Sequence, residues 1–498
     1  MRTQLLIASV LLAAASEVQS RTPPCDALVA AGLRERVLFP TDDAYEPQVQ
    51  TWWARNTRLH PWCLVLPHNT QEVSLTLTTL LEAGGGAGDW GIAVRSGGHS
   101  SAGNNIANGV TIDLSFMNAS SYDESTNVAS VQPGARWENV YADLEKQGVT
   151  AVGGRDGDVG VGGFLLGGGT SFFIGKRGFG CDSVVNYEVV LTNGTVVNAN
   201  ATANSDLFKA LKGGGSNFGI VTRFDLEALP SKELLYNLMY ISGNHSDAVV
   251  DTVVDYANHN ESLGDNALVV FYTHDSSSSL GTIIGVIHVN TQGEDSQTSF
   301  QNLKALPALS NSTALKTMAD AAAESKLPSG QLGVGSTLTF KNDPVILRYC
   351  VDAHEDLVKS LEASLGVGNF TTTTFFQPFP SYVGQLGQQR GGNMLGLENA
   401  GHNSVMWTGG VAVNTDDAAL AIAHSELMAL TARIKQFSES VDGASDLVYL
   451  NYADPSQNPL GSYGAERTDF LREVASLYDP TEAFQRRIPG GFKISRVK

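Results

Sequence analysis

The sequence predicts an α+β protein of two or three domains, for three reasons. Its 498 residues, 42% of them hydrophobic and 17% charged, can bury a larger core than one domain usually holds. From about residue 37 to residue 230, short apolar runs alternate with dense glycine, which indicates strands and sharp turns. Strand-like runs then alternate with longer helical patterns up to about residue 446, which indicates one sheet backed by helices.

The first 20 residues have the layout of a secretory signal peptide. Arg2 precedes an apolar run from Leu5 to Ala15, and small and polar residues follow. The alternatives are a buried N-terminal helix and a membrane anchor, but this run falls well short of the roughly 20 residues that span a bilayer. No later segment is long and apolar enough for a transmembrane helix. We therefore expect a secreted protein, cleaved near Ser20, with no membrane partner.

Acidic residues outnumber basic ones by 51 to 32, which gives a formal net charge of −19. No cluster of lysine and arginine stands out from this background. Binding to nucleic acid or to an anionic membrane needs concentrated positive charge. The sequence therefore disfavours both as partners.

The cysteines suit an oxidising compartment. Cys25 and Cys63 both lie near the start of the mature chain, and a bridge between them would stabilise the fold by about 4 kcal/mol in the chain-entropy model. Cys181 and Cys350 fit buried thiols as well as a second bridge, and no cysteine spacing suggests a zinc site. Seven Asn-x-Ser/Thr sequons permit glycosylation, at Asn118, Asn193, Asn200, Asn244, Asn260, Asn311 and Asn369.

Individual elements follow from the local patterns. Residues 186–200, NYEVVLTNGTVVNAN, predict a β-hairpin in which Asn193-Gly194 suits a type I′ turn. The later runs predicted as strands are residues 234–242, 267–274, 281–290, 370–379 and 404–414. The helical patterns cover residues 246–260, 345–366 and 417–437. Residues 447–498 are too few for a domain, so we expect them to dock on another part of the chain.

The glycine-rich segments suggest a ligand that carries phosphate, because exposed backbone N–H groups can hold an anion. The sequence has no P-loop, and VGVGGFLLGGG lacks the strand, helix and acidic residue of a dinucleotide fingerprint. It also has no H-E-x-x-H, no G-x-S-x-G and no pair of histidines at metal-ligand spacing. The ligand class therefore stays open on single motifs.

Several segments together resemble one family. RSGGHS at residues 95–100, the glycine-rich run at 159–194, LFKALKGGGSNFGIVTRFDLEALP at 207–230 and YLNYAD at 449–454 follow the order and spacing of the berberine-bridge-enzyme-like flavoproteins. These belong to the vanillyl-alcohol oxidase and p-cresol methylhydroxylase (PCMH) superfamily, and the fungal secreted members are most similar.

The resemblance implies three structural parts. A PCMH-type FAD-binding domain of two α/β subdomains would cover residues 21–230, with its core at about 58–230. A substrate domain, with an antiparallel sheet backed by helices, would cover residues 231–446. A C-terminal segment, residues 447–498, would return to the FAD-binding domain.

The resemblance also implies FAD as the cofactor, bound covalently through His99 alone. The loop from Arg95 to Ser100 would wrap the pyrophosphate, and His99 would be joined to the 8α-methyl group of the isoalloxazine. On local sequence alone, an ordinary turn histidine is the commoner interpretation of His99, and the other segments in register favour the flavin link. The other residues expected to bind FAD are Arg95, Ser96, Gly97, Gly98, Ser100, Val159, Gly160, Gly163, Gly167, Gly168, Gly169, Gly219, Ile220 and Val221.

Three positions decide how far the family pattern carries over. Many relatives have a second covalent link through a cysteine where this chain has Asp156, so we expect a single bond. Many have histidine in place of Phe164, so charge on the reduced flavin must be stabilised by other groups. Val159 resembles the family's oxygen gatekeeper, where valine leaves room for O₂, and this favours an oxidase over a dehydrogenase.

The motif near the C-terminus is expected to supply the catalytic residues Tyr449, Asn451 and Tyr452. A tyrosine with a lowered pKa would accept the proton of a substrate hydroxyl while hydride passes to the flavin. The alternative is that these tyrosines only pack, with their hydroxyls satisfied at the rim. Gln377 and Glu398 are further candidates for the substrate pocket.

We therefore expect a secreted FAD-dependent oxidase that oxidises a small alcohol, phenolic or secondary-metabolite substrate and reduces O₂ to H₂O₂. The first alternative is an oligosaccharide oxidase that makes lactones, which Asp156 mildly disfavours because doubly linked flavin accompanies sugar oxidation in this family. The second alternative is a flavin-loaded binding or defence protein with little turnover.

Overall fold

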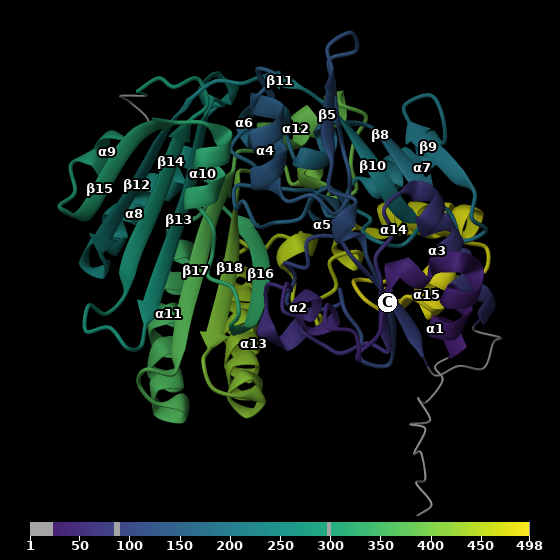
Figure 1. The fold of residues 1–498 in the computed structure, drawn as a ribbon. Helices are drawn as coiled ribbons and strands as arrows, with labels where there is room; N and C mark the ends of the chain where they lie inside the picture. The colour runs from purple at the N-terminus through teal and green to yellow at the C-terminus, as the bar shows by residue number, and fades with distance from the viewer. Residues whose placement is uncertain (1–22, 84–89, 296–299, 498) are drawn as a thin grey trace, which may run out of the picture.

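The computed structural model describes residues 23–83, 90–295 and 300–497 (Figure 1). The predicted signal peptide, residues 1–20, lies outside this part of the chain. Helices and strands are mixed along the chain, and four sheets form, so the predicted α+β class is confirmed. Within the described ranges, no helix is long and apolar enough to cross a membrane.

A small four-stranded sheet carries the first glycine-rich loop. Its strands run in the order β1 (Val37–Leu38), β2 (Cys63–Val65), β4 (Gly109–Asp113) and β3 (Gly91–Arg95). Strands β2, β4 and β3 are parallel, and α3 (Thr70–Ala83) lies between β2 and β3 in the chain. The loop RSGGHS therefore leaves the carboxyl end of a parallel strand, which is where open parallel sheets bind ligands.

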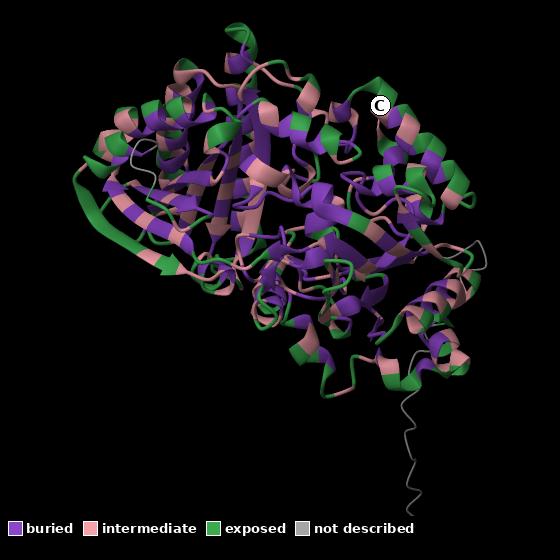
Figure 2. Cartoon of the chain, turned by 90° about the horizontal axis from the view of Figure 1, so that it is seen from above, coloured by how far each residue is buried: buried purple, intermediate pink, exposed green. Residues whose placement is uncertain are grey.

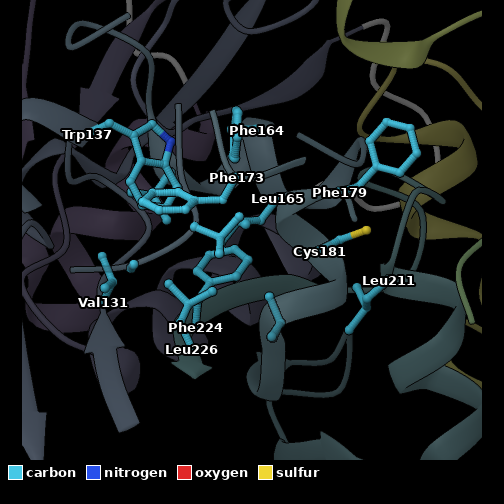
Figure 3. Close-up of a cluster of buried hydrophobic side chains, with 14 of the residues drawn as sticks. Val131, Trp137, Phe164, Leu165, Phe173, Phe179, Cys181, Leu211, Phe224 and Leu226 are labelled. Atoms are coloured by element: carbon cyan, nitrogen blue, oxygen red, sulfur yellow. The ribbon is translucent and has the colours of Figure 1, made fainter. Parts of the chain in front are cut away.

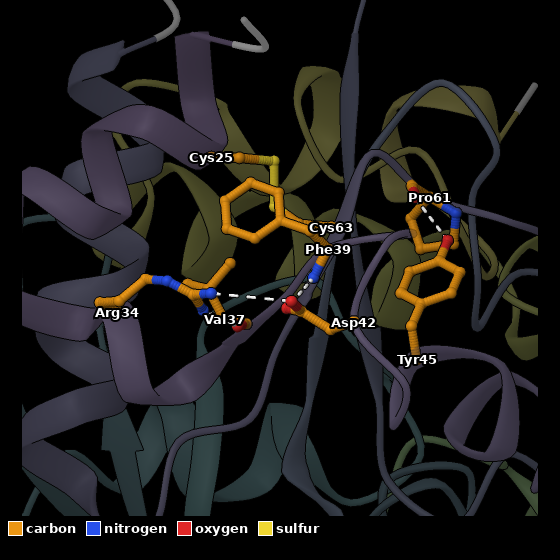
Figure 4. Close-up of a disulfide and its surroundings, with 8 residues drawn as sticks. All are labelled: Cys25, Arg34, Val37, Phe39, Asp42, Tyr45, Pro61 and Cys63. Atoms are coloured by element: carbon orange, nitrogen blue, oxygen red, sulfur yellow. Dashed lines mark hydrogen bonds and ion pairs between the residues drawn. A yellow bond between two sulfur atoms is a disulfide. The ribbon is translucent and has the colours of Figure 1, made fainter. Parts of the chain in front are cut away.

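The expected disulfide between Cys25 and Cys63 is confirmed and joins α1 (Pro23–Leu28) to β2 (Figure 4). Both half-cystines are fully buried in the core of the four-stranded sheet. Cys181 and Cys350 are separate buried thiols.

A second, antiparallel sheet has five strands, in the order β5 (Ser120–Asp123), β6 (Val128–Val131), β10 (Ile220–Glu227), β8 (Val184–Val190) and β9 (Val196–Asn200). The segment between β6 and β8 holds α4 (Trp137–Glu145), β7 (Val149–Thr150), α5 (Val161–Leu166) and α6 (Ile174–Arg177). Trp137, Phe164 and Phe224 are among the buried side chains that pack here (Figure 3).

The predicted hairpin is confirmed by β8 and β9, but its predicted turn type is wrong. A type I′ turn needs positive φ at both central residues. Gly194 has φ of +81°, whereas Asn193 does not adopt a positive φ. Gly194 N donates to Leu191 O, and Leu191 N donates to Thr195 O, both at 2.9 Å. The connection is thus one residue longer than a two-residue turn, and only its glycine is left-handed.

The third large sheet has seven antiparallel strands, and helices cover one of its faces, as predicted (Figure 1). The strand order is β15 (Ala308–Lys316), β12 (Leu234–Ser242), β14 (Ile283–Asn290), β13 (Asn266–Asp275), β17 (Phe370–Phe379), β18 (Ser404–Val413) and β16 (Leu332–Lys341). The covering helices are α8 (Ser246–Ala257), α11 (Pro344–Leu365) and α13 (Asp417–Ser440).

The two faces of this sheet have different partners because side chains alternate along each strand. Met239 and Ile241 of β12 pack towards the helices, whereas Leu234 and Tyr236 pack against the glycine-rich part of the chain. The edge strand β15 is largely exposed, and Figure 2 shows it in green.

The C-terminal residues lie against the four-stranded and the five-stranded sheet. Helix α14 (Ala465–Tyr478) packs on α7 (Ser205–Leu211), and Tyr449 is buried in the same core as Trp137. Further on, Phe484 joins the core of the four-stranded sheet. Figure 1 shows this yellow segment among the purple and teal elements, so YLNYAD is brought next to the glycine-rich loops.

Candidate active site

Two glycine-rich segments meet at the carboxyl end of β3. A Cβ atom on Gly97 would lie 2.5 Å from Gly160 Cα, so the two backbones touch. Ser96 Oγ accepts a hydrogen bond from Gly162 N at 3.0 Å and donates to Pro133 O. The loop RSGGHS is thereby fixed against the start of α5.

The side chain of Arg95 points into the protein interior and supports this loop instead of facing a ligand. Its guanidinium is 1% exposed, donates to Asp113 Oδ2 at 2.9 Å and to Thr51 O at 3.0 Å, and lies over the Trp52 ring. Gly98 follows with φ of +68°, and a Cβ there would meet the Arg95 guanidinium at 2.7 Å. Only the backbone of Arg95 is therefore placed to contact a cofactor.

His99 lies where the loop faces the rest of the site. Its ring stacks on Trp53, with the ring centroids 4.5 Å apart. Its Nε2 atom is buried and makes no hydrogen bond of acceptable geometry, although Asp156 Oδ2 lies 3.5 Å away. Ser100, next in sequence, is exposed and bonds locally to Ala102.

Asp156, where the resemblance described above implies a flavin-linked cysteine in many relatives, faces His99. Burial raises the pKa of this carboxyl, but the proximity of His99 and the hydrogen bonds from Leu327 N and Asp158 N lower it by more, so the net pKa falls. Leu327 N donates to Oδ2 at 3.0 Å and Asp158 N donates to Oδ1 at 2.8 Å. Asp156 is thus a fixed, ionised partner for His99.

The glycines after Val159 fall into two groups. A Cβ on Gly163 would have no heavy atom within 4 Å, so this exposed position of α5 is open to a ligand. Gly167, Gly168 and Gly169 are buried instead. A Cβ on Gly167 or Gly169 would collide with Asn451 or Phe164, and Gly168 has a φ of +114°, which disfavours any side chain. Their lack of a side chain is explained by internal packing and by backbone conformation.

The remaining expected cofactor residues lie at the junction of the four-stranded and five-stranded sheets. Ile220 belongs to the core of the four-stranded sheet and Val221 to the core of the five-stranded sheet, and both are 3% exposed. Gly219 packs against Val189. Val159 is half-buried beside Gly97, whereas the Phe164 ring packs edge-on against Trp137.

Tyr449 and Asn451 tie the C-terminal motif to the glycine-rich segment. Tyr449 Oη accepts from Gly169 N at 2.7 Å, and Asn451 Nδ2 donates to Phe164 O at 3.0 Å. Burial, together with the neighbouring Tyr452, raises the pKa of Tyr449 far above its ordinary value. The expectation of a lowered pKa is therefore wrong for Tyr449, whose hydroxyl supports the backbone.

Tyr452 lies in a polar cluster with Arg155, Thr170 and Gln377. Arg155 Nη2 donates to Tyr452 Oη at 3.2 Å, to Thr170 Oγ1 at 3.1 Å and to Gln377 Oε1. Thr170 Oγ1 also lies 3.2 Å from Tyr452 Oη. These groups come from the glycine-rich block, from β17 and from the C-terminal segment, so three distant parts of the chain build one site.

A small pocket adjoins this polar cluster. Arg155, Thr170 and Gln377 line it together with mainly apolar side chains, among them Ile174, Ala267, Leu268, Pro378 and Phe379. The predicted pocket residue Gln377 is thus part of the site. Glu398, the other pocket candidate, instead pairs with Arg467 and accepts a hydrogen bond from Gln388.

Sequence reasoning missed Arg155, Thr170 and Trp53. Arg155 precedes Asp156 in RDGDVG, a stretch in which only the missing cysteine drew attention. Its basic charge in so acidic a chain was the available signal. Trp53 carries no motif, and only the fold brings it to His99.

The residues present fit a bound FAD. His99 Nε2 faces Asp156, and Nδ1 makes no hydrogen bond within the described residues, which leaves it for the cofactor. Gly163 leaves an open surface on α5, and the loop at residues 96–98 presents backbone close to it. Across the described ranges, no group of three or more His, Cys, Asp or Glu side chains could hold a metal ion.

Comparisons with known proteins agree with this assignment. A family model described as an FAD binding domain matches residues 61–200. The FAD-dependent monooxygenase drtC of Aspergillus calidoustus is 33% identical over 476 residues, which cover 95% of this chain and 90% of that protein.

Solved structures share the fold at low sequence identity. The carbohydrate oxidase of Microdochium nivale superposes with a TM-score of 0.76 at 20% identity, covering 96% of this chain and 99% of that chain. Glucooligosaccharide oxidase of Acremonium strictum, described with a 6-S-cysteinyl, 8α-N1-histidyl FAD, has a TM-score of 0.74 at 18% identity and covers 96% and 99% of the two chains.

Proposed function

Because this chain belongs to the berberine-bridge-enzyme-like FAD-linked oxidoreductases, we propose that it is a secreted oxidase of a small alcohol, phenolic or secondary-metabolite substrate. It would pass two electrons to O₂ and form H₂O₂. The observation that carries this proposal is the polar cluster of Tyr452, Arg155, Thr170 and Gln377 beside the glycine-rich segment. When bound, FAD supplies the two-electron acceptor.

We assign His99 as the single covalent attachment of the cofactor. Trp53 holds the imidazole ring by stacking, and Asp156 faces its Nε2 atom, which leaves Nδ1 for the bond. An ionised carboxylate beside a ring N–H fixes the tautomer and the orientation of a histidine. Since Asp156 replaces the cysteine of many relatives, no second bond is expected.

Tyr452 is our candidate for the catalytic base. Its hydroxyl is the only one in the C-terminal motif that meets a cation, since Arg155 donates to it, whereas Tyr449 is occupied by Gly169 N. Tyr452 in its phenolate form would accept the proton of the substrate hydroxyl, and so become a neutral phenol, as hydride leaves the adjacent carbon. Thr170 and Gln377 fix Arg155, which in turn orients the tyrosine.

Two other activities compete with this proposal. Relatives bear the name monooxygenase, which implies an external reductant and an oxygen atom in the product. The solved neighbours include oxidases of sugars, which would make this chain an oligosaccharide oxidase. In the third alternative, a flavin-loaded binding protein with little turnover, no substrate would reduce the flavin.

One set of measurements separates these activities. The purified protein is mixed aerobically with a library of alcohols, phenolics and oligosaccharides, and O₂ uptake and H₂O₂ are followed with and without NADPH. An oxidase forms one H₂O₂ per substrate oxidised without NADPH, and its photoreduced flavin reoxidises rapidly in air. Label from ¹⁸O₂ in the product would establish a monooxygenase instead, and slow reoxidation in air would establish a dehydrogenase.

A further inference from the structure

The guanidinium of Arg155 is not paired with a carboxylate among the described residues. Its three acceptors are Thr170 Oγ1, Gln377 Oε1 and Tyr452 Oη, and all three are bonded to the same nitrogen, Nη2. In the described part of the chain, no carboxylate lies within ion-pair distance of this guanidinium.

The acidic residues that follow Arg155 in the chain are engaged elsewhere. Asp156 faces His99 and accepts from Leu327 N, and Asp158 lies 3.6 Å from Lys326 Nζ. Neither carboxylate is therefore paired with Arg155. Arg155 is thus half-buried, without an acidic partner in the described ranges, in a protein of net charge −19.

The remaining donors of Arg155 have no hydrogen-bond partner in the described protein. Nε and Nη1 carry three N–H groups between them, make no hydrogen bond within the described residues, and are not among the fully buried polar atoms. The adjoining pocket is otherwise lined largely by apolar atoms of Ile174, Leu268 and Phe379. This pocket has a volume of about 20 Å³, room for about one water molecule, so it fits the anionic end of a ligand and not an apolar body.

We propose that Arg155 binds a carboxylate of the substrate and so selects an acid that also carries the oxidisable hydroxyl. This inference rests on the proposed function and adds the substrate class. Nη2 stays with Tyr452, Thr170 and Gln377, while Nε and Nη1 donate to the carboxylate. The same side chain would thereby align the substrate with Tyr452.

The test uses benzoate and its neutral isostere benzamide as probes, with binding followed by the perturbation of flavin absorbance. We expect wild type to bind benzoate at least about 10-fold more tightly than benzamide, because a charge-assisted hydrogen bond is at stake. Arg155→Met should remove this preference and Arg155→Lys should retain part of it. Arg348→Met, at an exposed arginine of α11, is the matched control and should behave as wild type.

Equal binding of the two probes by wild type, no binding of either, or a benzoate preference that survives in Arg155→Met would overturn the assignment. If Arg155→Met loses its flavin, wild type is compared with Arg155→Lys instead. A preference for benzoate that is undiminished in Arg155→Lys counts against a role for the Nε and Nη1 donors of Arg155. Peroxide formation from neutral alcohols without a preference for acids would leave the oxidase proposal standing and remove this one. Preferential binding of benzoate without peroxide from any substrate would leave the carboxylate site standing and remove the oxidase proposal.

Discussion

Substituting alanine at two glycines of the same site should have opposite effects on stability. In Gly97→Ala, the new Cβ would lie 2.5 Å from Gly160 Cα and 2.6 Å from Gly160 N, so backbone must move. Forcing extra volume into packed structure costs about 1–3 kcal/mol. Gly163→Ala places its methyl group in open space on α5, where alanine is favoured over glycine by about 0.5–1 kcal/mol.

The same two substitutions should agree in their effect on flavin content. Both positions are assigned to the cofactor surface, so both variants should incorporate less FAD per chain than wild type. Stability is measured by urea unfolding, followed by tryptophan fluorescence, on flavin-free protein in a His99→Ala background. Flavin per chain is read from the absorbance at about 450 nm of variants that keep His99.

Two results would refute this reasoning. If Gly163→Ala destabilised the flavin-free protein as much as Gly97→Ala, the surface of α5 would not be open. If Gly163→Ala incorporated as much FAD as wild type, Gly163 would not face the cofactor, and its glycine would need another explanation.

Three further predictions concern the rest of the molecule. Tyr452→Phe should slow the reduction of flavin by substrate about 10²- to 10⁴-fold and leave the flavin content normal. Tyr449→Phe leaves the buried Gly169 N–H unpaired and should mainly lower the free energy of unfolding, by about 1–3 kcal/mol. Equal effects of the two substitutions on the rate would contradict this division of roles. Replacing Cys25 and Cys63 together by serine opens a loop closed over 38 residues and should lower the free energy of unfolding by about 4 kcal/mol, and an unchanged urea midpoint would contradict this. Burial, with a contribution from a neighbouring arginine, lowers the pKa of Lys493 to about 7. Between pH 7 and about 10 only the unfolded chain holds that proton, so the free energy of unfolding should rise with pH. Lys493→Met should lose this rise, and an unaltered pH profile would exclude Lys493 as its source.

Strong local patterns predicted most of the seven-stranded sheet. Five of its strands and its three long helices were predicted within a few residues, because apolar periodicity is clear in each of them. Strand β15 was missed because its residues are mostly exposed at the sheet edge and show no apolar alternation. Strand β16, LGVGSTLTFK, was missed because glycine and polar residues weaken its pattern.

The candidate site was only partly predictable from sequence. The contact of Gly97 with Gly160 and the position of His99 fit the glycine-rich segments that pointed to a cofactor. Arg155 could not be assigned, because its partners Gln377 and Tyr452 lie 222 and 297 residues away and only the packed fold joins them. For the same reason, the two tyrosines of one short motif could not be given different roles.

The most direct test of the account is whether flavin is bonded to His99. The purified protein is precipitated with acid, and flavin absorbance is measured in the pellet and in the supernatant. If His99 is the covalent attachment, the flavin of wild type stays in the pellet and the flavin of His99→Ala is released. Release of all the flavin from wild type, or retention by His99→Ala, would contradict it.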